Sequence, residues 1–271
     1  MSLKEALGYD AVLGIVERHI AREVDWVAKR GCAIGVLGLD EVAISMGRHD
    51  YVVIVSARLP NGCTTVSAVL PHREKNTVKA FLQTPPKRLQ RTIHSVCTDL
   101  YPGYIKAANE VLGSGVVVVD PYHLPQKYRE SADALRRKER KRLKQELSEE
   151  EYESIKCTMW PFRKNRADLT PNEAESLEHL FEHSPQLKLA YTFREELTAI
   201  FEQELTKEGA IREIEDWQTR VAQSELTCFD GFIKTLDTYM DEITNYFLNR
   251  HTSGFVEGVN NKIKVLKHRC Y

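Results

Sequence analysis

The spacing of apolar residues changes twice along the chain. Residues 1–30 place apolar side chains three or four positions apart, which is the spacing of a helix with one buried face. From residue 32 to about residue 120, short runs rich in β-branched side chains predict strands instead. After Pro125 the strand pattern stops, and residues 126–248 return to helical spacing. We therefore expect a sheet region followed by a helical region.

The first predicted strands form a hairpin. YVVIVSARL (51–59) and CTTVSAVL (63–70) flank Pro60-Asn61-Gly62, where Pro presets one backbone angle and Asn and Gly tolerate positive φ. Further strands are predicted at 32–40, 93–99 and 115–119, and helices at 75–90, broken at Pro85-Pro86, and at 104–112. A hairpin followed by alternating helices and strands predicts a mixed sheet with helices on its faces, an α/β fold.

The helical region contains several predicted breaks. They fall near Trp160-Pro161, Thr170-Pro171, Ser184-Pro185 and Gly209. Thr170 and Glu173 have the spacing of a helix-capping pair. Residues 252–267 predict one more helix. We also expect Trp160 to pack in a core, although an aromatic side chain there could stack on an extruded base.

Composition narrows the class of protein. The 271 residues are 42% hydrophobic and include 38 Lys and Arg against 39 Asp and Glu. The protein as a whole therefore has no excess positive charge that would indicate nucleic-acid binding. If it binds a nucleic acid, it must do so through local basic patches. The longest apolar runs, such as Val116–Val119, are far too short for a membrane span, and the N-terminal residues lack a signal-peptide pattern. Six cysteines occur singly without a CxxC pair, which favours reduced packing thiols in the cytoplasm over disulfides or zinc.

Three of the predicted strands end in an acid: Asp40, Asp99 and Asp120. Residues just beyond strand ends line the crevice in which ligands bind to open sheets. Carboxylates brought together there repel one another unless a hard cation binds them. The alternative is that each Asp caps the turn that follows its strand.

The last predicted helix has two distinct sides. Phe255, Val259, Ile263 and Leu266 form an apolar stripe, and Glu257, Asn261 and Lys264 lie together opposite it. Glu257 is in the first turns, where the positive helix end favours an acid. This side is either a solvated face or part of a site.

Four segments in order resemble the DDE transposases of the bacterial insertion-sequence family L-three. They are GLDEVAISMGRHDYVVIVSARLPNG, TDLYPGYIKAA, VVVVDPYHL and HTSGFVEGVNNKIKVLKHRCY, and the stretch LTPNEAESLEHLFEHSPQLKLAYTFREEL is similar to that family too. The resemblance implies a ribonuclease-H-like mixed sheet flanked by helices, with a large all-α insertion before the last catalytic helix. The implied parts are a helical N-terminal remnant (1–30), the core (31–124), the insertion (125–248) and a closing helix with the third acid (249–271).

By position in these motifs, the catalytic, metal-binding acids implied by the resemblance are Asp40, Asp99 and Glu257. Asp120 and His123 occupy the family's Asp-x-x-His element and are expected to support the site. An all-carboxylate site suits Mg²⁺ or Mn²⁺, and two such ions would clamp a scissile phosphodiester. The implied activity is cleavage and strand transfer of an insertion element by a cytoplasmic, nucleoid-associated protein that acts as a homo-oligomer on DNA, without membrane contact.

Local basic clusters are the candidates for holding element ends and target DNA. One lies beside Glu257 and consists of Lys262, Lys264, Lys267 and Arg269. The other is the run 136–144, with Arg136, Arg137 and Arg140 as DNA-binding candidates; its alternative is a solvated helix balanced by nearby glutamates.

The resemblance also indicates what the chain lacks. Full-length relatives begin with a cysteine-rich zinc-binding segment and a helix-turn-helix, and no CxxC occurs here. We therefore expect a catalytic domain with truncated ends. A nuclease without transfer activity and a catalytically silent DNA-binding fragment are the alternative functions.

Overall fold

The computed structural model describes residues 33–43, 51–256, 258, 260–262 and 265. The chain divides into two compact units, which we call the sheet unit (Met1–Asp120 with Asp241–Tyr271) and the helical unit (Pro121–Met240). The helix predicted over 1–30 lies outside the described residues. In the described part of the chain, no helix is long and apolar enough to cross a membrane.

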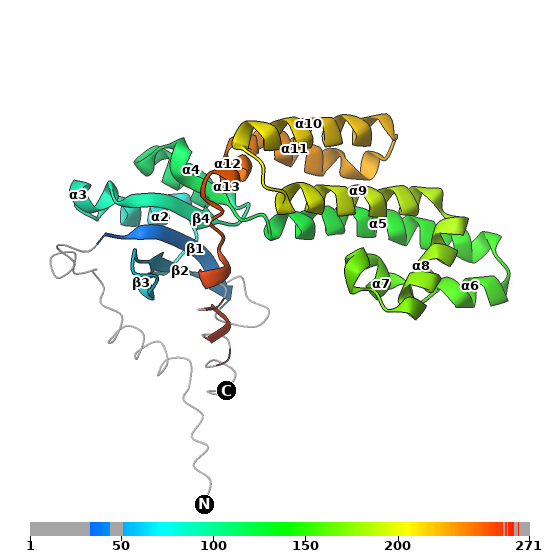
Figure 1. The fold of residues 1–271 in the computed structure, drawn as a ribbon. Coiled ribbons are helices and arrows are strands. Elements are labelled where there is room, and N and C mark those ends of the chain that lie inside the picture. The colour runs from blue at the N-terminus through cyan, green and yellow to red at the C-terminus, as the bar shows by residue number, and fades with distance from the viewer. Residues whose placement is uncertain (1–32, 44–50, 257, 259, 263–264, 266–271) are drawn as a thin grey trace, which may run out of the picture. The chain divides into compact units, whose positions relative to one another are not determined.

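The sheet unit is built on five strands in the order β3-β2-β1-β4-β5 (Figure 1). Strand β1 pairs antiparallel with β2 and parallel with β4, β2 pairs antiparallel with β3, and β4 pairs parallel with β5. The bounds are β1 Gly35–Ala43, β2 Tyr51–Arg58, β3 Thr64–Leu70, β4 Ile93–Thr98 and β5 Val117–Val119. This mixed sheet confirms the predicted α/β class and is consistent with a ribonuclease-H-like fold.

The predicted hairpin is confirmed at the turn between β2 and β3. Gly62 adopts a φ of 83°, and the Asn61 Oδ1 atom accepts a hydrogen bond of 3.0 Å from the Cys63 amide. The Leu59 amide donates to the Cys63 carbonyl at 2.9 Å, which closes the ladder. The turn residues therefore act as their backbone preferences predict.

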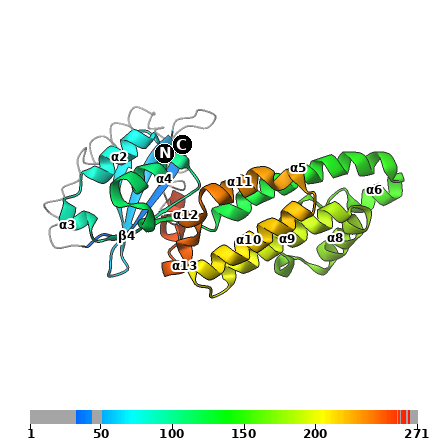
Figure 2. The ribbon, with the colours of Figure 1, turned by 90° about the horizontal axis from the view of Figure 1, so that it is seen from above.

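Helices of the sheet unit cover both faces of the sheet. Helices α2 and α4 lie side by side (Figures 1 and 2), because both connect strands that run parallel and such connections are right-handed. Tyr246 and Phe255 pack on the other face. The bounds are α2 Lys75–Gln83, α3 Lys87–Gln90, α4 Pro102–Leu112, α12 Met240–Thr244 and α13 Tyr246–Asn249, with a short 3₁₀ turn at Ser114–Val116. The predicted break at Pro85-Pro86 thus separates α2 from α3.

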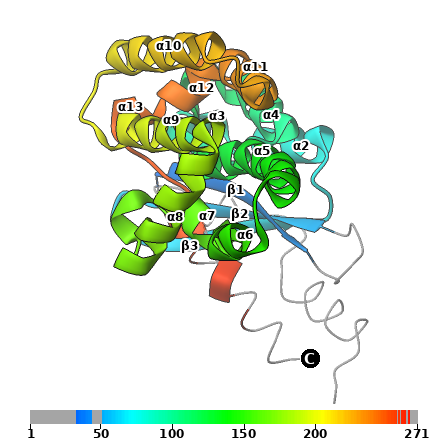
Figure 3. The same ribbon diagram turned by 90° about the vertical axis from the view of Figure 1, so that its right-hand side faces the viewer.

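The helical unit consists of helices packed on the long α5. Helix α5 lies along α9, α9 contacts α10, and α6, α7 and α8 gather at the C-terminal end of α5 (Figures 1 and 3). The bounds are α5 His123–Glu146, α6 Glu149–Ile155, α7 Met159–Arg163, α8 Pro171–His183, α9 Pro185–Glu202, α10 Lys207–Gln223 and α11 Asp230–Thr238, with 3₁₀ turns at Arg166–Asp168 and Thr227–Phe229.

Buried aromatic side chains hold α5, α9 and α10 together. The ring of Tyr128 stacks on Phe229 with centroids 4.5 Å apart, and its hydroxyl donates to the Ala190 carbonyl at 2.7 Å. The indole of Trp217 is fully buried and donates to the Phe193 carbonyl at 2.9 Å. Each polar atom that these large side chains bury therefore has a partner, as a stable core requires.

Capping residues set the first turns of helices α8 and α10. Thr170 and Glu173 form the predicted capping box at the start of α8. The break predicted near Gly209 is confirmed, because α9 ends at Glu202 and α10 begins at Lys207. Gly209 itself lies in the first turn of α10, and its amide donates to the Thr206 hydroxyl at 3.1 Å. The capping threonine, three residues earlier, sets the start of this helix.

The cysteines divide into buried and exposed thiols. Among the described residues, Cys63, Cys97, Cys157 and Cys228 are free, in agreement with the predicted reduced set. Cys97 is buried in the sheet, and burial together with the nearby charge of Asp120 raises the pKa of its thiol to about 12. Cys63 and Cys157 are exposed, so the predicted packing role is wrong for these two.

Candidate active site

Strand register brings Asp40, Asp99 and Asp120 to one row of the sheet. The three acids directly follow Leu39, Thr98 and Val119, and these three residues are partners in adjacent parallel strands. The amide of Asp120 continues this ladder by donating to the Thr98 carbonyl at 2.9 Å. Because paired residues point to the same face and neighbouring strands lie about 4.8 Å apart, the three carboxylates share one face and one edge.

Asp40 does not end its strand as predicted. Strand β1 continues to Ala43 because β2 pairs with it up to Ala43↔Tyr51, whereas pairing with β4 stops at Leu39↔Thr98. Asp40 therefore stands at the point where β1 loses its parallel partner. Its backbone remains fixed by pairing with β2.

Both carboxylate oxygens of Asp40 accept a hydrogen bond. Oδ1 accepts from the Glu41 amide at 2.7 Å, and Oδ2 accepts from the side-chain amide of Asn260 at 2.5 Å. Each oxygen keeps a second lone pair, so these bonds orient the carboxylate and leave it able to bind a cation. Asp40 and Asn260 are 220 positions apart, so the closing segment contributes directly to the site.

The closing segment packs on the same face of the sheet as Asp40. Residues 254–256, 258, 260–262 and 265 are helical. A Cβ atom on Gly38 would lie 2.1 Å from the Val256 side chain, so the glycine permits this close approach. Val256 and Asn260 are buried, whereas Asn261 and Lys262 are exposed. Sequence reasoning placed Phe255 on the buried stripe, where it is half-buried, but missed Val256 and Asn260.

Asp120 anchors the start of this segment. It is buried, and its Oδ2 atom accepts hydrogen bonds from both the amide (2.7 Å) and the hydroxyl of Ser253. Ser253 immediately precedes the helical residues, so Asp120 fixes where they begin. His123, its predicted companion, is the first residue of α5 in the helical unit, and its ring contacts Tyr122 edge-to-face at 6.0 Å.

Asp99 and Tyr104 complete the described part of the acidic edge. The Oδ1 atom of Asp99 accepts from the Tyr101 amide at 3.0 Å. Tyr104 on α4 is fully buried, and its hydroxyl has no hydrogen-bond partner among the described residues. Burial raises the pKa of Tyr104 far above its usual range, and the charges of Glu41, Asp99 and Asp40 act in the same direction. Tyr104 therefore presents a protonated hydroxyl near the acids.

Glu41 is adjacent to Asp40 but belongs to a different cluster. Strand alternation turns it to the opposite face, where Arg73 Nη1 lies 3.3 Å from both of its oxygens. The guanidinium of Arg73 also lies over the rings of Tyr51 and Tyr101, at 4.7 Å and 5.2 Å from their centroids. Glu41 is therefore neutralised by Arg73, unlike Asp40.

The described acids fit a divalent cation in chemistry and in environment. Carboxylate oxygens are the ligands that Mg²⁺ and Mn²⁺ prefer. The buried Oδ1 atom of Asn260, on the amide that donates to Asp40, has no partner within the described residues, as expected of a group that would contact water around an ion. No three His, Cys, Asp or Glu side chains of the described residues form a ready-made metal cluster. Glu257, the third predicted ligand, lies outside the described residues.

The predicted basic residues differ in their exposure. Lys262 is exposed, and Lys264, Lys267 and Arg269 lie outside the described residues. In the helical unit Arg137 and Arg140 are exposed, but Arg136 is 7% exposed and paired with Asp133. Arg136 faces inward because it follows the buried side of α5 marked by Ala132, Leu135 and Leu143.

The prediction that Trp160 packs in a core is wrong. Its side chain is 63% exposed and does not pack in a core, and the guanidinium of Arg163 lies 5.4 Å from its ring centroid. The adjacent Pro161 and Phe162 occupy the buried side of α7 instead. A short helix buries only one side, and Trp160 is on the other.

Comparison with known proteins decides the family. A family model of ISL3-type DDE transposases, described as "Transposase", matches residues 37–271 and so covers most of the chain. The chain belongs to the ISL3 family of DDE transposases. It is also 29% identical, over 256 residues, to the transposase for insertion sequence element IS1001 of Bordetella parapertussis. That alignment covers 94% of this chain and 60% of the relative, so the chain spans about 60% of the length of the curated relative. No solved structure matches the chain.

Membership of the ISL3 family confirms the predicted transposase class. The family match also covers Asp40, Asp99, Asp120 and the closing segment. Sequence reasoning missed Asn260, Ser253 and Tyr104 as supporting residues. The position of Asn260 in FVEGVNN, three residues after Glu257, was the available signal, since residues three apart share a helix face.

Proposed function

We propose that this chain performs divalent-metal-dependent phosphodiester cleavage and strand transfer of an insertion element, with Asp40, Asp99 and Glu257 as catalytic acids. The observation that carries the proposal is the pairing Leu39↔Thr98, which brings Asp40 and Asp99 to the same edge and face of the sheet. The hydrogen bond from Asn260 to Asp40 supports the closing segment as the source of the third acid.

The residues of the chain have distinct roles in this proposal. Asp40 and Asp99 would hold the cations, with Asn260 and the Glu41 amide orienting the Asp40 carboxylate. Asp120 would keep Ser253 and the following helical residues in position. When bound, two divalent cations neutralise the charge of a phosphodiester and stabilise its attacking and leaving oxygens. The chain then needs no covalent nucleophile.

Basic side chains would hold the DNA around this chemistry. Lys262 is exposed two residues after Asn260, and with Lys264, Lys267 and Arg269, which lie outside the described residues, it makes up the proposed DNA-binding set of the closing segment. In the helical unit Arg137 and Arg140 are the exposed members of the predicted set. We propose that the protein acts on both element ends and target DNA as a homo-oligomer, in the cytoplasm and associated with the nucleoid.

The test compares acidic variants of the full chain. Asp40→Asn, Asp99→Asn and Glu257→Gln should each abolish Mg²⁺-dependent cleavage of an element-end duplex and strand transfer of a pre-cut end, while gel-shift affinity for DNA stays near wild type. Glu41→Gln is the matched control, because it removes a neighbouring carboxylate that Arg73 already neutralises. Wild-type activity of any one of the three variants would remove that residue from the proposed triad.

The same assays distinguish the alternatives. Cleavage without transfer of pre-cut ends would identify a nuclease. Binding of DNA without cleavage or transfer in Mg²⁺ and in Mn²⁺ would identify a catalytically silent DNA-binding fragment.

A further inference from the structure

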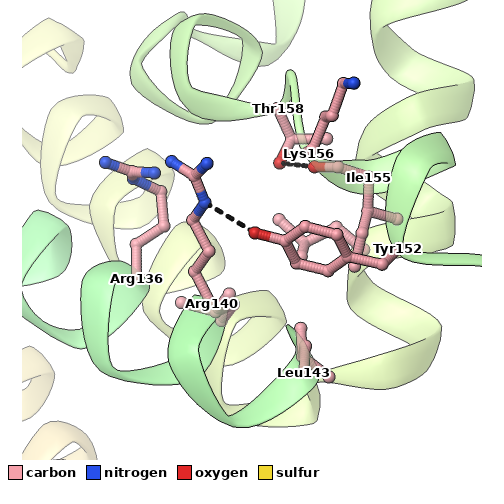
Figure 4. Close-up of a pocket in the computed structure, with 9 residues that line it drawn as sticks. Arg136, Arg140, Leu143, Tyr152, Ile155, Lys156 and Thr158 are labelled. Atoms are coloured by element: carbon pink, nitrogen blue, oxygen red, sulfur yellow. Dashed lines mark hydrogen bonds between the residues drawn. The ribbon is translucent and has the colours of Figure 1, made fainter. Parts of the chain in front are cut away.

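We propose that the helical unit contains a binding site for one phosphate group of the DNA backbone, in a pocket at the C-terminal half of α5. The polar residues that line it are Arg136, Arg140, Tyr152, Lys156 and Thr158, and Leu143 contributes to its apolar wall (Figure 4). We call this hollow the arginine pocket. None of its lining residues belongs to the proposed acidic site.

Arg136 reaches the arginine pocket from a buried position. The residue is 7% exposed, and its Nε atom donates to Asp133 at 3.1 Å. Its two terminal nitrogens have no acceptor in the part of the chain that the structure describes. Figure 4 shows the guanidinium groups of Arg136 and Arg140 next to each other and directed to the same side. The terminal nitrogens of Arg136 are therefore available to donate hydrogen bonds to a ligand in the arginine pocket.

The charge of Arg136 is only partly compensated within the protein. Asp133 also accepts a hydrogen bond of 2.8 Å from Arg163, so one carboxylate serves two guanidinium groups. Burial of Asp133 favours its neutral form, but the bonds from Arg163 and Arg136 outweigh it and lower the pKa of the carboxyl group. The acid is therefore ionised, and the cluster of two arginines and one aspartate keeps a net positive charge.

Arg140 adds a second positive group without a carboxylate partner among the described residues. Its Nε atom donates to the Tyr152 hydroxyl at 2.9 Å, and the hydroxyl keeps its own hydrogen for another acceptor. Thr158 donates its hydroxyl to the Ile155 carbonyl at 2.7 Å, and Lys156 pairs with Glu153. The lining contains no carboxylate. Two neighbouring guanidinium groups repel each other, so the arginine pocket favours an anion that accepts several hydrogen bonds.

The size of the arginine pocket favours a small group. The arginine pocket is small, with an empty volume of about 290 Å³ that includes open solvent. A phosphate group presents several acceptor oxygens in little space, and guanidinium groups match its geometry. We therefore assign the ligand as a phosphate and not a whole nucleotide.

The surface of α5 favours DNA as the source of that phosphate. Exposed Arg137, Arg140, Lys141 and Lys144 are spaced by three, four and seven positions, so they share one helix face. Arg140 belongs both to this face and to the arginine pocket, which makes the two surfaces continuous. A backbone that follows the basic face would present phosphates to the pocket. This choice of source rests on the proposed function, whereas the phosphate site does not.

Two variants of the full chain test the phosphate site. Arg140→Gln and Tyr152→Phe change residues that are not fully buried, whereas Arg136→Gln could unfold the unit. In calorimetric titration with inorganic phosphate, Arg140→Gln should weaken affinity about ten-fold or more, and Tyr152→Phe by a few-fold. Arg212→Gln, which removes an exposed arginine from α10, is the control and should not change affinity.

A salt titration with a DNA duplex tests the source. Arg140→Gln should reduce the slope of log affinity against log salt by about 0.9, the value for one lost phosphate contact, and added inorganic phosphate should produce no further loss in that variant. Arg212→Gln should keep the wild-type slope.

The outcomes test separately whether the phosphate site exists and whether DNA supplies the phosphate. Absence of phosphate binding by the wild type, or equal binding by Arg140→Gln, overturns the site. Phosphate binding with an unchanged DNA slope overturns DNA as the source and leaves a site for free phosphate. Absence of metal-dependent cleavage by the wild-type chain in the assays above overturns the proposed function without affecting either result here.

Discussion

The helical unit and the acidic edge of the sheet unit hold their carboxylates in different ways. In the helical unit, buried Asp133 is paired with Arg136 and Arg163, and buried Glu139 accepts from Arg142 at 2.8 Å. In the sheet unit, among the residues that the structure describes, the half-buried Asp40 receives its hydrogen bonds from amides and not from a cation. The first arrangement stabilises a fold, and the second orients a carboxylate while preserving its charge for a ligand.

The comparison predicts the largest stability loss in the helical unit. Asp133→Asn leaves two guanidinium groups without their shared carboxylate, and breaking a buried pair costs about 3 kcal/mol. Denaturant unfolding followed by Trp fluorescence measures this loss. Asp168→Asn, an exposed acid of the same unit, is the control and should change stability by less than about 0.5 kcal/mol. Equal losses in both variants would contradict the role of Asp133.

In the sheet unit, the next largest loss of stability should come from overpacking at Gly38. Gly38→Ala places a Cβ atom against Val256, Phe255 and Ser56, and overpacking of this kind costs about 1–3 kcal/mol. The closing segment should also become more accessible to protease. Gly115→Ala is the matched control, since a Cβ atom there meets nothing within 4 Å. An unchanged unfolding midpoint for Gly38→Ala would show that the segment does not pack on β1.

Asn260→Ala tests whether the Asn260 side chain orients the Asp40 carboxylate for metal binding. Loss of the amide that orients Asp40 should raise the Mg²⁺ concentration for half-maximal cleavage about 10–100-fold, the usual effect of removing a residue that supports a metal ligand. A metal titration of cleavage rate measures it. Asn261→Ala, exposed and adjacent, is the control. If the metal requirement of Asn260→Ala matched that of the control, Asn260 would not be a positioning residue.

The smallest predicted effect is on the pH dependence of the sheet unit. Burial lowers the pKa of His251, with Arg58 and His94 acting in the same direction, and its Nδ1 atom lies 2.8 Å from the Ser95 hydroxyl. The folded state therefore binds fewer protons than the unfolded state, so stability should fall as pH drops below about 6.5. Thermal unfolding between pH 7.5 and 5.0 measures this slope. His251→Gln should flatten it, and an unchanged slope would assign the pH dependence to other groups.

Features set by local sequence were predictable. Pro60-Asn61-Gly62 fixes a turn through its own backbone preferences, and Thr170 with Glu173 caps a helix through contacts three residues apart. The candidate acids Asp40, Asp99 and Glu257 came from the family resemblance, and the catalytic role of all three stays a prediction; Glu257 also lies outside the described residues.

Features set by tertiary contact were not predictable. The length of β1 beyond Asp40 depends on its pairing with β2, and the burial of Arg136 depends on Asp133 and Arg163. Trp160 is exposed because its neighbours Pro161 and Phe162 fill the buried side of a short helix. Asn260 reads as an ordinary polar helix residue until its contact with Asp40 is seen. Local patterns contain no information about such distant partners.

The bond between Asn260 and Asp40 has a consequence for biosynthesis. After Asp40, the ribosome must make 220 more positions, including the whole helical unit, before the partner of Asp40 exists. Contacts of such long sequence separation also form late in folding, because the intervening chain must be ordered first. A nascent chain therefore carries its first acids without the residue that orients them until Asn260 has been made.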